Sequence, residues 1–156
     1  MIQLSITGSA TQLESIEEHA VATALELGDK FLADRFFSEF PPTSDEIDRA
    51  INFTEETLVP VQDLFKDDSV LYSNDSMAVQ IANLAFNTSK EGKQINVPAV
   101  ELENVFFRLS EIVNGLPASQ DILPDSNQFT AYLLIIREVM HHLDFERVII
   151  ELKDKR

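Results

Sequence analysis

Residues 2–16 read IQLSITGSATQLESI, and this stretch decides the fold class. Positions 2, 4 and 6 are apolar and alternate with polar residues, which is the period of a strand with one buried face. Gly8 marks a turn, after which residues 12–16 return as a second strand, and residues 19–27 form a third strand that ends at Gly28. Three consecutive strands with short connections predict an antiparallel meander.

Helical spacing replaces the strand period after Gly28. The apolar residues predict one helix from residue 29 to the proline pair at 41 and 42, where proline ends it. A second helix begins at the capping box of Thr43 and Glu46, and Pro60 kinks or shortens it near its end.

Strands and helices alternate in the remaining chain. Residues 69–73 (SVLYS) and 147–152 (RVIIEL) are β-prone and predict buried strands. Between them we expect a surface loop over residues 87–94 and three helices, of which one carries the stripe Met77, Ile81 and Leu84, one begins at Pro98, and one is capped by Asp125 or Ser126. The order predicts an α/β fold of the ribonuclease H-like class, the plan of an actin-like ATPase lobe. We expect one domain over residues 1–156, with a mixed five-stranded sheet and helices on its faces.

Composition narrows the function classes. The 156 residues carry a formal charge of −15, which repels polyanions and argues against nucleic-acid binding. Cysteine is absent, so disulfides, thiol catalysis and thiolate metal sites are excluded. The N-terminus has no basic region typical of a leader, and no apolar run reaches a membrane-spanning length, so we expect a cytoplasmic protein without membrane contact.

Two segments resemble a known family. Residues 25–61 (LELGDKFLADRFFSEFPPTSDEIDRAINFTEETLVPV) and residues 138–150 (EVMHHLDFERVII) resemble the second lobe of the core of exopolyphosphatases and guanosine pentaphosphate phosphatases, the Ppx/GppA family. The resemblance covers nearly the whole chain, while the family's first lobe, which carries most of its catalytic glutamate chemistry, has no counterpart in it. The expectation is a single-lobe relative.

The family's first phosphate loop follows the pattern Asp-x-Gly-Gly-Gly-Ser-x-Glu, whose glycines let backbone amides approach phosphate oxygens. On this resemblance the loop positions are occupied by Ser5, Thr7, Gly8, Ser9, Ala10, Thr11 and Gln12, so both carboxylates are replaced by neutral residues. The second loop corresponds to residues 72–76, where Ser73 and Ser76 keep hydroxyls and Asp75 adds a negative charge. The third element is replaced by Glu151, Leu152 and Lys153.

These departures imply that catalysis is lost, and no catalytic residue is nominated. The loop is either an ordinary hairpin turn or a vestigial phosphate site, which would use magnesium only if phosphate binding persists. The leading hypothesis is a binding or interaction module that forms a homodimer or meets a partner protein where the family has its other lobe. The alternatives are a split phosphatase completed in trans, and a weak nucleotide or alarmone sensor acting through Gly8, Thr11, Ser73 and Ser76.

Other residue groups favour structural roles. Glu138 and His142 stand at i, i+4 and could chelate one ion, but no third ligand is in register, so we expect no metal site. His141 and His142 suit the C-terminal end of a helix dipole. The pairs at 17–18, 55–56 and 67–68 are expected to be solvated carboxylates. Six phenylalanines exceed what one stripe per helix needs, and they pack in the core or form a patch for a partner: Phe31, Phe36, Phe37, Phe40, Phe106 and Phe107.

Overall fold

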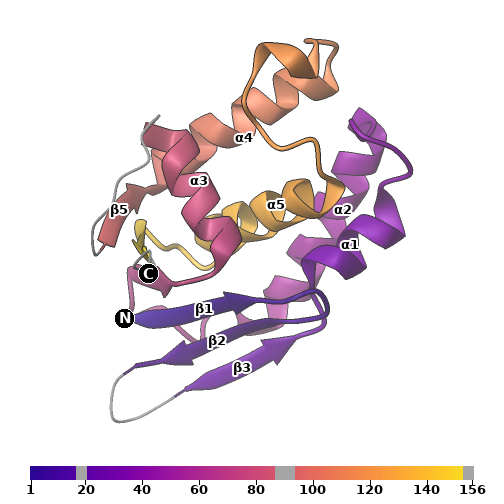
Figure 1. Ribbon diagram of the computed structural model, residues 1–156. Coiled ribbons are helices and arrows are strands. Elements are labelled where there is room, and N and C mark those ends of the chain that lie inside the picture. Colours follow the sequence, from indigo (N-terminus) through magenta and orange to yellow (C-terminus); the bar gives the residue numbers. More distant parts are fainter. Residues whose placement is uncertain (17–20, 87–93, 153–156) are drawn as a thin grey trace.

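The computed structural model describes residues 1–16, 21–86 and 94–152. Its strands form one mixed sheet in the order β3-β2-β1-β4-β6-β5. The strands are β1 Ile2–Ile6, β2 Thr11–Ser15, β3 Ala22–Leu25, β4 Val70–Ser73, β5 Gln94–Pro98 and β6 Arg147–Glu151. The first three form the predicted antiparallel meander, β4 runs parallel to both β1 and β6, and β5 closes the far edge antiparallel to β6. Figure 1 shows the meander lying beneath the helices.

The helices are α1 Asp29–Phe36, α2 Ser44–Leu58, α3 Ser76–Phe86, α4 Ala99–Val113 and α5 Asn127–His142, with short 3-10 helices at Val59–Val61 and Ala118–Gln120. The caps follow the sequence signals. Thr43 and Glu46 form the complete capping box of α2, and the Ser126 hydroxyl accepts from the Phe129 amide at the start of α5. The α-helical part of α2 ends just before the short helix that contains Pro60, so the predicted shortening is confirmed.

The core lies between one face of the sheet and the helices. On β1 the side chains of Ile2, Leu4 and Ile6 are buried, whereas Gln3 is exposed, and β2 repeats this alternation. α5 is buried along most of its length and packs against α1, α2 and α4, which makes it the central helix. In Figure 1 it runs through the middle of the helical layer.

Within the described residues the sheet has six strands, so the expectation of five was wrong. The missed strand is β5, in which Ile95 and Val97 are buried and Gln94 and Asn96 are exposed, the same period of two that identifies β1. Pro98 ends this strand and precedes α4, although the sequence predicted that it begins the helix. A proline is tolerated there because β5 is an edge strand, where a missing amide donor breaks no ladder. Apart from Gln94, the predicted loop over residues 87–94 lies outside the described residues.

Two other boundaries also differ from the expectation. α1 ends at Phe36, and Phe37 is already extended, so the helix does not continue to the prolines at 41 and 42. The reason lies in the next segment, where the carboxylate of Glu46 accepts from both the amide and the hydroxyl of Ser38, at 3.2 and 2.9 Å, and holds it out of a helix. β3 is shorter than predicted within the described residues, and positions 17–20, with the Glu17 and Glu18 pair and His19, lie outside them.

Candidate functional site

The first loop resembling a phosphate site is a tight turn closed by its own groups. The Thr7 amide donates to the Ala10 carbonyl at 2.8 Å, and the Thr7 hydroxyl oxygen accepts from the amides of Ser9 and Ala10 at 3.4 and 3.1 Å. A phosphate-binding turn instead directs such amides outward to an anion. In this chain the Thr7 hydroxyl accepts from these amides in place of an anion.

The N-terminus of α1 is docked on the same turn. The Asp29 amide donates to the Thr7 carbonyl at 3.0 Å, and the Phe31 amide donates to the Gly8 carbonyl at 2.9 Å. Gly28 makes this possible, because a Cβ there would lie 2.1 Å from the Gly8 carbonyl oxygen. Two donors that a helix N-terminus commonly offers to an anion are therefore used inside the chain.

Asp75 connects the second loop to the first. It follows β4 and directly precedes α3, and its Oδ2 accepts from the Ile6 amide at the end of β1 and from the Tyr132 hydroxyl of α5, both at 2.9 Å. The Asp75 amide donates to the Ser73 hydroxyl oxygen at 3.2 Å. The two loops predicted from the sequence thus meet at the carboxyl ends of neighbouring parallel strands, where α/β sheets place their sites.

A second carboxylate, from Asp29, lies at the same edge and was not predicted. It is 4% exposed, and its Oδ1 accepts from the Gln128 amide group at 2.9 Å. Burial raises the pKa of Asp29 above its ordinary value, the Gln128 hydrogen bond opposes that shift, and the negative charge of Asp75 adds to it. Burial, followed by the charge of Asp75, also raises the pKa of Tyr132 well above its ordinary value. The sequence offered no local signal for these contacts.

The other predicted site residues are scattered around this edge. Ser5 and Gln12 face each other across β1 and β2, on strand positions that alternate with the buried ones. Thr11 is fully buried and donates its hydroxyl to the Leu27 carbonyl at 2.5 Å, which is a structural role. Ser76 begins α3 and is exposed. At the third motif the Glu151 carboxylate accepts from the Tyr72 hydroxyl, and Lys153 lies outside the described residues.

Chemically, this edge is a network of satisfied groups in which carboxylates accept from backbone and side-chain donors. Within residues 1–16, 21–86 and 94–152, no third carboxylate or histidine joins Asp29 and Asp75 in a possible metal-ligand group. A nearby cation, Lys30, forms an ion pair with Asp34 at 2.7 Å. These contacts hold β1, α1, α3 and α5 together.

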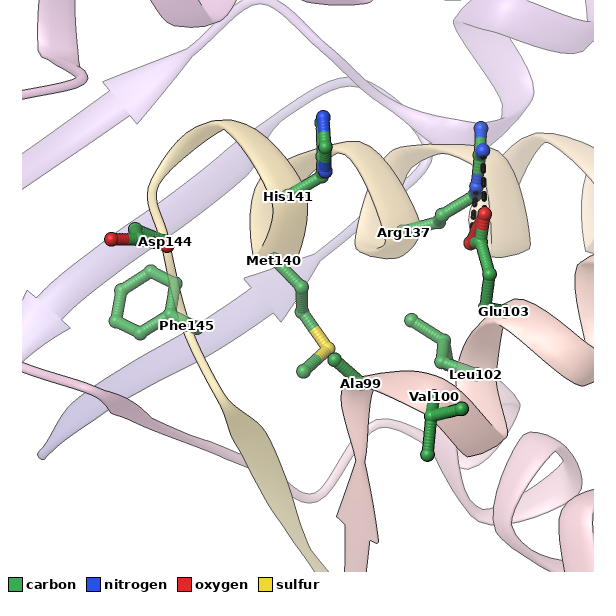
Figure 2. Close-up of a pocket in the computed structure, with 9 residues that line it drawn as sticks. All are labelled: Ala99, Val100, Leu102, Glu103, Arg137, Met140, His141, Asp144 and Phe145. Carbon is green, nitrogen blue, oxygen red and sulfur yellow. Dashed lines mark hydrogen bonds and ion pairs between the residues drawn. The ribbon is translucent and has the colours of Figure 1, made fainter.

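A cavity of about 420 Å³ lies at the other end of α5 (Figure 2). It is lined by the start of α4 and the last part of α5, and Figure 2 shows Arg137 and Glu103 directed toward each other at its wall. Asp144 and Phe145 close the side nearest β6. The cavity is therefore separate from the edge where the sequence resemblance places the phosphate loops.

The six phenylalanines divide between core and surface. Phe37 and Phe106 are buried, Phe36 and Phe40 are partly buried, and Phe31 and Phe107 are 39% and 62% exposed. Phe31 and Phe36 both contact the ring of Phe53 on α2, at centroid distances of 6.0 and 5.5 Å. One aromatic group thus lies beside the first loop.

No protein-family model matches this sequence, and no curated protein matches it. Among solved structures, the fold matches a crystal structure of the Aquifex aeolicus Ppx/GppA phosphatase at a TM-score of 0.76 and 17% identity, covering 96% of this chain and 52% of that one. An exopolyphosphatase-like protein matches at a TM-score of 0.77 and 12% identity, covering 96% and 54%. An exopolyphosphatase from Cytophaga hutchinsonii matches at 0.72 and 14%, covering 96% and 52%.

These matches confirm the α/β fold expected from the sequence resemblance, that of a lobe in the Ppx/GppA structures. The chain spans about half the length of each structure that it matches. At such low identity the likeness concerns the fold. No helix in the described part of the chain combines the length and apolar character that crossing a bilayer requires.

Proposed function

We propose that this chain is an exopolyphosphatase-related lobe that has lost phosphohydrolase activity and acts as a binding or interaction module. The observation that carries the proposal is the position of Asp75. Its carboxylate accepts from the Ile6 amide at the place where the two loops meet. The family resemblance assigns this place to an anionic phosphate. A carboxylate that already receives these hydrogen bonds replaces the ligand and also repels it.

The repulsion is large on the scale of binding. Two like charges about 4 Å apart interact by on the order of 4 kcal/mol at an effective dielectric constant of about 20. Asp29 lies at the same edge, and the net charge of −15 extends the unfavourable field beyond it. Neutral replacements at Ser5 and Gln12 remove the two carboxylates that the family pattern uses, so the chain retains the fold of the site without its chemistry.

The partner that fits is a protein surface, either a second copy of this chain or another polypeptide. Phe31 is exposed beside the closed turn and packs on Phe53, which places aromatic area at the edge that lost its ligand chemistry. Aromatic side chains are enriched at protein interfaces, whereas an acidic, closed turn offers little to a phosphate chain. We propose no cofactor for this activity.

Thermal denaturation of the purified chain with polyphosphate, pyrophosphate, ATP or guanosine tetraphosphate tests the loss of phosphate binding. Each ligand is added at about 1 mM with and without Mg²⁺, at fixed ionic strength. A site with a Kd of about 10 µM would stabilise the fold by about 2.7 kcal/mol. For a chain of this size that is a rise in Tm of roughly 5–10 °C. We expect no such rise.

A rise in Tm that the wild-type chain shows and the Gly8→Val variant lacks would contradict the proposal, because it would show a working phosphate turn. Release of phosphate from polyphosphate by the chain alone, above Ser5→Ala and Gln12→Ala controls, would contradict it equally. Self-association of the chain is measured separately, by sedimentation at protein concentrations from about 5 to 200 µM. We expect association that Phe31→Ser weakens and that Phe107→Ser, a change at an exposed ring on α4, leaves unchanged.

A second candidate function is one lobe of a phosphatase completed by another polypeptide. It is favoured by the coverage, since the chain spans about half of each matched structure. The test is polyphosphate hydrolysis after a polypeptide corresponding to the other half of a matched structure is added. Absence of hydrolysis, together with absence of a stable complex, would count against this candidate and leave the non-catalytic proposal standing.

A further inference from the structure

A second cluster of polar side chains joins α2 to the C-terminal end of α5. It consists of Glu55 from α2 and of Glu138 and His142 from α5, with one oxygen or nitrogen atom of each within 4.8 Å of the others. In the described ranges 1–16, 21–86 and 94–152, it is the one group of three such residues with this spacing. It lies about 15 Å along α5 from Gln128, which contacts Asp29, so it is separate from the closed loops.

The nitrogen of His142 is the feature that needs a partner. Its Nε2 lies 3.1 Å from Glu138 Oε2 and 3.4 Å from Glu55 Oε1. The atom is buried and makes no hydrogen bond to any described residue, although both carboxylates lie within ion-pair distance of it. Buried polar atoms are nearly always hydrogen-bonded, and this nitrogen lies between two carboxylates without a hydrogen bond to either, which is the placement of a ligand atom around a shared cation.

The distances fit the coordination shell of a small cation. Metal–ligand bonds of about 2.0–2.1 Å in a tetrahedral site place neighbouring ligand atoms about 3.3–3.4 Å apart. The separations of 3.1 and 3.4 Å lie close to that value. One imidazole nitrogen with two carboxylates suits Zn²⁺ and similar transition metals, and leaves a fourth position for water. Mg²⁺ and Ca²⁺ prefer ligand sets made only of oxygen.

A supporting contact fixes the buried ligand. Glu138 is 3% exposed, and Arg137 Nη1 donates to its Oε1 at 3.0 Å, which leaves Oε2 directed to His142. Arg137 is itself held by a two-pronged contact with Glu103, at 2.7 and 2.8 Å, visible in Figure 2, and lies over the ring of Phe106. Such outer contacts orient metal-binding carboxylates.

Electrostatics favour a dication at this place. The Glu138 side chain is 3% exposed, so little water reaches its carboxylate. Other charged or titratable groups acting on it are Arg137, His142, Glu55 and His141. The single positive charge of Arg137 is shared between Glu103 and Glu138, so the carboxylates of Glu55 and Glu138 keep a net negative charge that a divalent ion would meet.

We propose that Glu55, Glu138 and His142 bind one divalent transition-metal ion of the Zn²⁺ type, which ties α2 to α5. The sequence already indicated two of these three ligands, since Glu138 and His142 stand at i, i+4. The third ligand comes from α2, and its position could be found only from the packing of the two helices. The site is independent of any phosphate ligand.

The test is metal titration of the full chain, produced without a histidine tag and stripped with a chelator. Zn²⁺ binding is followed by calorimetry, and Co²⁺ binding by the visible absorption of a tetrahedral complex. We expect one ion per chain. His142→Gln and Glu55→Gln should each weaken binding by roughly 100-fold, because losing even an outer-shell partner of a metal ligand costs about 10–100-fold. Glu55 is 40% exposed, so its variant tests the site with little risk to folding.

The matched control is His141→Gln. His141 is the neighbouring residue, its ring lies 5.0 Å from that of His142, and it is not part of the cluster. Its variant should bind the ion as wild type does. The proposal is overturned if wild type binds no Zn²⁺ or Co²⁺ at about 100 µM, or if the His141 variant loses as much affinity as the His142 variant. Unchanged binding in both His142→Gln and Glu55→Gln would overturn it as well.

Discussion

Replacing Gly28 by alanine is expected to destabilise the protein strongly, although the backbone there suits any residue. Gly28 has φ −108° and ψ 155°, an extended conformation, so alanine introduces no dihedral strain. The obstacle is space. A Cβ would lie 2.1 and 2.3 Å from the carbonyl oxygen and carbon of Gly8, and 2.4 Å from the Ser9 amide nitrogen. Carbon contacts normally lie at about 3.5–4.0 Å, and backbone atoms cannot rotate away.

The expected loss follows from what must move. Separating α1 from the turn breaks the hydrogen bonds from Asp29 to Thr7 and from Phe31 to Gly8, each with a net contribution of about 1 kcal/mol. Overpacking typically adds about 1–3 kcal/mol. The free energy of unfolding should therefore fall by about 3–5 kcal/mol, and Tm by roughly 6–20 °C.

Gly8→Ala is the matched control. A Cβ at Gly8 meets the Cβ of Lys30 at 3.4 Å, which is ordinary contact, so its effect should stay within about 1 kcal/mol. Both variants are compared by urea denaturation and by thermal scans, with equal m-values required for the comparison. If Gly28→Ala is no less stable than Gly8→Ala, the close approach of α1 to the turn is not what makes glycine necessary at position 28.

Two further predictions concern pH. Because the pKa of Asp29 is raised in the folded state, this group stabilises the fold most below its ordinary value of 3.8, and the contribution is lost as pH rises through the folded pKa. The unfolding free energy of Asp29→Asn should therefore rise relative to that of wild type as the pH increases from about 4 to 7. A difference between the two proteins that stays constant with pH in urea titrations would refute this. Asp121 behaves oppositely, since Arg108 lowers its pKa through contacts of 2.6 and 3.0 Å. Asp121→Asn should cost about 1–2 kcal/mol at pH 7, and the difference in unfolding free energy should shrink as pH falls through the lowered pKa of Asp121. A difference that does not shrink with falling pH would argue against it.

The predictable parts of the fold are those written in local patterns. The period of two and the Gly8 turn in residues 2–16 predicted the first two strands of the meander, and the spacing of Thr43 and Glu46 predicted the start of α2, because each signal lies within a few residues. The same period marks Ile95 and Val97, but Pro98 was interpreted as a helix start, and β5 was missed. Proline is compatible with both readings, and only the position of β5 at a sheet edge decides between them.

In the candidate site, too, local features were predictable and contacts between distant segments were not. Both loops were located in the sequence through its family resemblance, but the contacts that close them come from distant segments. Gln128 meets Asp29 across 99 positions and Tyr132 meets Asp75 across 57, so no local pattern contains them. Glu55 was expected to be a solvated carboxylate for the same reason. Its approach to His142 depends on how α2 packs against α5, which periodicity does not specify.

The place of β6 in the sheet has a consequence for synthesis on the ribosome. Among the described residues β6 is the last strand, yet it lies between β4 and β5 and pairs with both. Until residues 147–151 have emerged, β4 has an unpaired edge and β5 has no neighbour in the sheet. Unpaired strand edges are prone to join other chains, so the partly synthesised sheet is open to such pairing during that interval. The meander can form early, but β4 and β5 are joined into one sheet only by β6.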